Sequence, residues 1–86
     1  MKHELSEQAI KELVEQNYKG TKVESVAIED DVVMLKVMWK RGGTAPNVAL
    51  RILRKYPEIR VVHFVGGFVE TVYTRNTLRF AGYDNI

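Results

Sequence analysis

The chain has 86 residues, of which 45% are apolar and 28% are charged, so it should form one domain around one core and is not composed like a disordered protein. It contains no cysteine, which excludes disulfides, thiolate metal sites and cysteine nucleophiles. The net charge is only +2, but residues 1–31 hold eight acids and four bases (net −4), and residues 32–86 hold three acids and nine bases (net +6).

The start of the chain is charged and lacks the apolar stretch of a signal sequence. No apolar run approaches the roughly 18 residues of a membrane span. We therefore expect a cytoplasmic protein without a membrane partner.

The first predicted element is an amphipathic helix over residues 7–19. Ser6 can accept a free backbone amide at its N-cap, and Gly20 is placed to end it. The apolar positions recur at helical spacing: Ile10, Leu13, Val14 and Tyr18.

Two strands are expected next, over residues 22–28 and 32–40, joined by an acidic turn at residues 29–31. Period-two alternation in the second strand indicates which side faces the core. The core side would carry Val33, Leu35, Val37 and Trp39.

A second helix is predicted over residues 45–56, capped by Thr44 and stopped by Pro57. Pro46 suits its first turn, where the missing amide costs nothing. A complete apolar stripe runs along this helix: Ala45, Val48, Ala49, Ile52, Leu53 and Tyr56.

Residues 59–65 and 68–74 are read as a hairpin around Gly66-Gly67, because glycines suit the positive φ angles of two-residue turns. This turn predicts three cross-strand pairs: Val65 with Phe68, Phe64 with Val69, and His63 with Glu70. The tail over residues 75–86 is too apolar to be free and should pack on the domain or on a partner.

The resulting order, αββαββ, predicts a single α+β domain over residues 1–86. We expect a two-layer sandwich with two helices on one face of a four-stranded, mostly antiparallel sheet; the strand order stays open. Both sheet faces carry apolar residues, with Ile59, Val61, Val65 and Val72 on one and Val62, Phe64, Val69 and Tyr73 on the other. The second face needs a cover, for which the tail, a symmetric partner or a ligand are the candidates.

The candidate nucleic-acid-binding residues are polar or basic and lie on or near the second helix. If they converge, they form a phosphate-binding surface. The competing interpretation is a solvated face whose last cations complement the helix dipole. The set comprises Lys40, Arg41, Asn47, Arg51, Arg54, Lys55 and Arg60.

Two weaker patterns allow other chemistry. Gly42-Gly43-Thr44 opens the second helix and could bind an anion, although glycines there also serve ordinary turns. The predicted His63–Glu70 pair could support acid–base catalysis or a pH-sensitive contact, or simply stabilise the hairpin. With two histidines sixty residues apart, we expect no metal, no cofactor and no enzyme.

The leading interpretation is a small, non-enzymatic protein that binds DNA or RNA phosphates through the basic set. The alternative is a protein-interaction module, a homodimer that uses the second sheet face and the tail. Its interface would comprise Met34, Met38, Val61, His63, Val72, Leu78 and Phe80.

Overall fold

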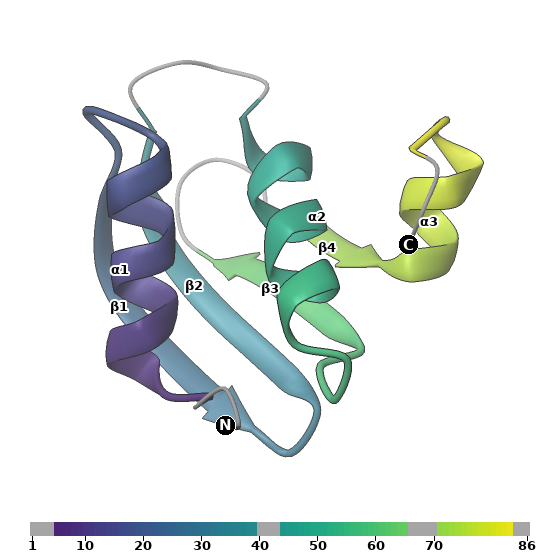
Figure 1. The fold of residues 1–86 in the computed structure, drawn as a ribbon, viewed down its shortest axis with the longest axis horizontal. Helices are drawn as coiled ribbons and strands as arrows, with labels where there is room; N and C mark the ends of the chain where they lie inside the picture. Colours follow the sequence, from purple (N-terminus) through teal and green to yellow (C-terminus); the bar gives the residue numbers. More distant parts are fainter. Residues whose placement is uncertain (1–4, 40–43, 66–70, 84–86) are drawn as a thin grey trace.

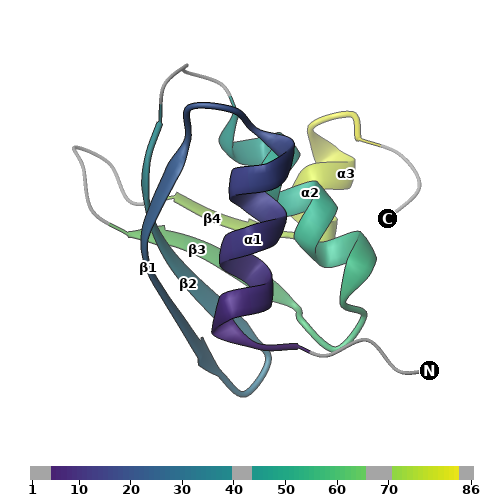
Figure 2. The same cartoon turned by 60° about the vertical axis from the view of Figure 1, so that its left-hand side comes forward.

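A computed structural model describes residues 5–39, 44–65 and 71–83, which form three helices and one four-stranded sheet (Figure 1). The helices are α1 (Glu7–Asn17), α2 (Ala45–Lys55) and α3 (Arg75–Phe80). The strands are β1 (Lys22–Glu29), β2 (Val32–Met38), β3 (Val61–Val65) and β4 (Thr71–Thr74), in the sheet order β1-β2-β3-β4. The helices lie on one side of the sheet (Figure 2), which confirms the predicted α+β class and its two layers.

Helix α1 begins as its sequence predicts. The Ser6 side chain accepts a hydrogen bond from the Ala9 amide at 3.0 Å, and Ile10 and Val14 are buried. The helix ends at Asn17, two residues before the predicted end, and Gly20 then takes a φ of +86°. Only glycine adopts that left-handed conformation without a steric penalty.

Strands β1 and β2 form an antiparallel hairpin in which Glu29 pairs with Val32. The connecting Asp30 has a φ of +54°, which aspartate tolerates better than most residues. On β1 the register shifts between Val23 and Ser25, and the Val23 amide donates to the Glu15 carboxylate at 3.0 Å. This bond ties α1 to the edge strand.

Strands β2 and β3 run parallel, with Met34 opposite His63. A parallel pair needs a crossover connection, and α2 supplies it. The buried stripe predicted for α2 is confirmed: Val48, Ala49, Ile52, Leu53 and Tyr56.

The predicted register of the last hairpin is wrong by two residues. His63 lies opposite Val72 rather than Glu70, and Phe64 lies opposite Thr71 rather than Val69. A shift of two keeps every side chain on the same sheet face, so the hydrophobic pattern alone cannot exclude it. Residues 66–70, with the predicted Gly66-Gly67 turn and the Val65–Phe68 pair, lie outside the described residues.

Strand β3 starts later than predicted. The Ile59 amide donates to the Tyr56 carbonyl, and the Ile59 side chain is fully buried. Assigning Ile59 to the second sheet face was therefore wrong, because it lies in the loop that leaves α2 and turns into the core.

The core lies between the helices and the sheet. An aromatic cluster forms part of it: the Trp39 and Phe64 rings meet edge-on with centroids 5.2 Å apart, and Phe64 and Tyr73 do so at 5.8 Å. Phe64 is buried, and Trp39 and Tyr73 are partly buried. Trp39 is thus a core residue, as the alternation in its strand predicts.

The tail packs onto the domain, as expected, but it does so as helix α3. Thr74 and Thr77 form a reciprocal capping box at its start, and Leu78 is only 1% exposed. Phe80, by contrast, is 97% exposed. Because α3 lies in the helix layer beside α2 (Figure 1), it does not cover the second sheet face.

Arg75 connects α3 to the end of α2. Its guanidinium donates to the carbonyls of Ile59 at 2.6 Å, Leu53 at 2.7 Å and Tyr56 at 3.3 Å. The last carbonyls of a helix have no partner within the helix, so one charged side chain satisfies them from a distant part of the chain.

Substituting Arg75→Met should lower the free energy of unfolding by about 2 kcal/mol, because charge-assisted bonds to partly buried carbonyls are lost. Urea unfolding followed by circular dichroism would measure the change. Arg79→Met is the matched control, since Arg79 is exposed and donates to Asn76 within its own helix. Equal stability of the two variants would contradict the anchoring role of Arg75.

Truncating Leu78 should lower the free energy of unfolding much more than truncating Phe80. Leu78→Ala leaves a cavity in the core and should cost roughly 2–4 kcal/mol of stability. Phe80→Ala should change stability by less than about 0.5 kcal/mol, as expected for an exposed side chain. Thermal and urea unfolding of both variants would check this contrast, and a stable Leu78→Ala protein would place Leu78 outside the core.

Candidate functional site

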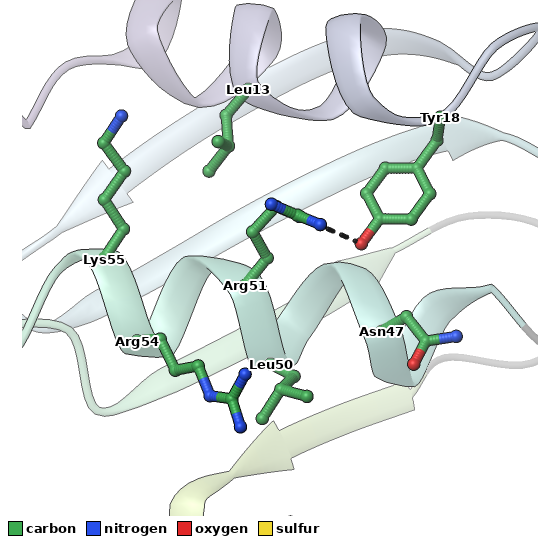
Figure 3. Close-up of a pocket in the computed structure, with 7 residues that line it drawn as sticks. All are labelled: Leu13, Tyr18, Asn47, Leu50, Arg51, Arg54 and Lys55. Carbon is green, nitrogen blue, oxygen red and sulfur yellow. Dashed lines mark hydrogen bonds between the residues drawn. The ribbon is translucent and has the colours of Figure 1, made fainter. Parts of the chain in front are cut away.

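An open groove of about 640 Å³ lies between α1 and α2 (Figure 3). Four of the predicted nucleic-acid-binding residues line it, on α2, together with two leucines and a tyrosine. The lining consists of Leu13, Tyr18, Asn47, Leu50, Arg51, Arg54 and Lys55.

The position of the polar residues follows from the rotation of α2 on the sheet. Val48 and Ile52 point into the core, so residues on the opposite side of the helix must face outward. Asn47, Arg51 and Lys55 are spaced four residues apart, which places them above one another along that outer side. All three are exposed.

Arg51 bridges the two helices. Its Nε donates to the Tyr18 hydroxyl at 3.3 Å, and its guanidinium carbon lies 5.7 Å from the centre of the Tyr18 ring. Figure 3 shows the side chain extending from α2 toward the end of α1. This bond uses one of five guanidinium N–H donors, so the group is oriented while it keeps donors for a ligand.

The other two cations of the groove, Arg54 and Lys55, extend from opposite sides of α2. In Figure 3, Lys55 extends toward α1, whereas Arg54 and Leu50 extend from the other side of the helix. The Lys55 ammonium lies 5.8 Å from the centre of the Tyr56 ring, a cation–π distance that leaves its hydrogen-bond donors available.

Three cations and no carboxylate line the groove among the residues that the structure describes, so this part of its lining is positively charged. The acids of α1 lie elsewhere: Glu15 binds the Val23 amide beside β1, and Glu12 accepts from Gln8. Burial, with a smaller contribution from Glu58, raises the pKa of the Tyr56 hydroxyl above its usual value. Like any tyrosine without a lowered pKa, Tyr56 adds no negative charge below this helix at neutral pH.

A second buried hydroxyl behaves in the same way. Burial, and next the neighbouring Tyr83, raise the pKa of Tyr73. Tyr73 belongs to the aromatic cluster of the core, whose packing accounts for this burial.

The structure does not bring the whole predicted basic set together. Arg60 is absent from the groove lining, and it lies 3.9 Å from an oxygen of Asp31 beside the β1–β2 turn. Lys40 and Arg41, with the predicted anion site at Gly42-Gly43, lie outside the described residues. Thr44 stands at the N-cap of α2 without a side-chain capping bond.

The predicted interface residues separate into two groups. Met34, Met38, Val61, His63 and Val72 share the sheet face opposite the helices, as the register shows. Leu78 is buried in the core and was wrongly placed in the interface, and Phe80 projects from α3 in the helix layer. The His63–Glu70 pair, on which the catalytic alternative rested, is replaced by His63–Val72.

Sequence reasoning missed the wall that α1 contributes to the groove. Leu13 and Tyr18 were assigned to the helix stripe, yet both line the groove, and Leu50 lies outside the predicted stripe of α2. The signal for Tyr18 was its place at the end of α1, where a large ring can reach past its own helix.

Within residues 5–39, 44–65 and 71–83, no three metal-ligating side chains form a cluster suited to an ion. The same part of the chain has no helix with the length and apolar character needed to span a bilayer. No protein-family profile matches this chain, and comparisons with curated proteins and with solved structures give no match.

Proposed function

We propose that this protein binds nucleic acid by holding the phosphate backbone in the groove between α1 and α2. The observation that carries the proposal is one open groove that, among the described residues, is lined by three cations and no carboxylate. Lys and Arg side chains that replace condensed counterions supply most non-specific nucleic-acid affinity. Arg51 and Lys55 extend toward α1 and Arg54 extends from the other side of α2, so a polyanion lying along α2 could contact all three.

The spacing along α2 suits a short stretch of backbone. Residues 51 and 55 are four positions apart, or about 6 Å along a helix axis. Asn47 lies about 6 Å further along and offers a neutral amide donor, a type of side chain that often contacts phosphate oxygens. The groove would thus contact a few successive phosphates of one strand.

The position of α2 favours a single strand over the major groove of a duplex. A recognition helix must project into a major groove about 12 Å wide. Helix α2 instead lies between α1 and α3 in the helix layer (Figure 1), so its neighbours would meet the duplex first. A flexible strand can enter the groove, where the half-exposed Tyr18 ring offers a surface for a stacked base.

The same lining supports binding rather than catalysis. Acid–base or nucleophilic chemistry needs a carboxylate, imidazole, thiol or activated hydroxyl near the substrate. The groove offers guanidinium, ammonium and amide groups and a tyrosine hydroxyl that bonds Arg51. We therefore propose a non-enzymatic role.

Fluorescence anisotropy with labelled single- and double-stranded DNA and RNA tests the proposal. With three phosphate contacts, single-strand affinity should fall about 20-fold between about 50 and 200 mM salt, a log–log slope of about −2.1. Arg51→Glu/Arg54→Glu should make the slope shallower, with a magnitude of about 0.7 or smaller, because Lys55 is the one groove cation left among the described residues.

A matched control reverses two charges elsewhere. Lys22→Glu/Arg60→Glu changes the net charge equally, and both residues are exposed and absent from the groove lining. This control should retain a slope near that of the unmodified protein. Equal losses in both variants would mean that net charge rather than the groove binds the ligand, and no binding at either salt concentration would refute the proposal.

A further inference from the structure

The sheet face opposite the helices, called the open face below, consists of rows that cross the strands. The central row is Ala27, Met34, His63 and Val72, as the three strand pairings show. The next row toward the β1–β2 turn consists of Glu29, Val32, Val61 and Thr74. The next row away from that turn consists of Ser25, Lys36 and Val65. Beyond this row, Lys22 pairs with Met38.

This face is apolar at its centre and is not covered by the described part of the chain. The helices lie on the other side of the sheet (Figure 2), and the tail joins them through the buried Leu78. Met38 is 59% exposed and Val72 51%. With the half-buried Met34 and Val61 they form an apolar patch, and a patch of this kind on a protein surface is often functional.

The charges of the open face are segregated by row. Lys36 and Lys22 lie on one side of the central row, and Glu29 lies on the other. Asp30 and Asp31 extend the acidic end, where Arg60 approaches Asp31 at 3.9 Å and offsets one of these charges. Among the described residues, the face therefore has a basic end and an acidic end, separated by a row that is apolar except for His63.

We propose that the open face binds a second copy of this chain, with a two-fold axis that runs along the central row. This axis exchanges the two ends, so Lys36 of each copy approaches Glu29 of the other across the interface. Lys22 then approaches the acidic turn. The arrangement stacks two sheets with their apolar rows in contact, about 10 Å apart as in other packed sheets.

A two-fold axis along the strands is the other way to stack two copies of this face. It would keep each row at its own level, so Glu29 would lie at the level of Thr74 of the second copy, and Lys36 at the level of Val65. Among the described residues of these rows, no opposite charges would then lie at the same level. The segregation of charge selects the axis along the row, because an isologous interface must complement itself.

The size of the face indicates a concentration-dependent dimer. Four strands about 4.8 Å apart and rows about 6.6 Å apart give a footprint of roughly 400 Å² per copy. A standard interface buries about 800 Å² per partner. We therefore expect association to be weak and to require measurement at high protein concentration.

Sedimentation equilibrium up to about 1 mM protein, a range suited to weak complexes, tests the proposal with Lys36→Glu and Glu29→Lys. Each variant alone should weaken the dimer about tenfold, because two symmetric attractions become repulsions. An equimolar mixture should recover the association: in the mixed dimer the new glutamate faces the new lysine, and native Glu29 faces native Lys36.

Recovery of association in the mixture could not be explained by effects within one chain. In each copy Lys36 and Glu29 are two rows and one strand apart, about 14 Å, so they do not pair with each other. Circular dichroism of each variant checks that it is folded. A chain that stays monomeric at every concentration overturns the proposal, and so does a mixture that associates no better than the separate variants.

Discussion

Val48, Ala49, Ile52 and Leu53 are all buried against the sheet, and this burial leaves α2 only one rotation about its axis. Turning the helix by even one residue would expose part of this stripe, at a cost of roughly 1.5–3 kcal/mol for each large side chain. The opposite side of the helix, with Arg51 and Lys55, must then face outward. The cationic groove is therefore a consequence of core packing as well as of composition.

The same helix determines the rest of the topology. Because α2 crosses from β2 to β3 over one face, these strands run parallel, and β1 and β4 join them as antiparallel edges. The helices gather on that face, and the other face is left with Met34, His63 and Val72 in one row. All three helices of the described residues lie on one side of the sheet, so none of them covers the other side.

The sequence was sufficient for features that depend on neighbouring residues. The Ser6 cap, the stripes of α1 and α2, and the alternation in β2 were all predicted correctly, because each depends on period and propensity. The hairpin register was wrong because β4 is held at its far end, where Thr74 caps α3 and Arg75 bonds Ile59 and the carbonyls that end α2. The Thr74 cap is local, but the Arg75 bonds span sixteen or more positions, and no local pattern shows them.

Tyr18 was missed as a groove residue for the same reason, since its partner Arg51 is 33 positions away. The two proposed surfaces are nevertheless independent, because they lie on opposite sides of one sheet. Stacking two copies through their open faces would turn both grooves outward, away from each other. A short strand could not reach both, so each chain would bind nucleic acid separately, and dimerisation would alter affinity only for a strand long enough to pass around the sheets.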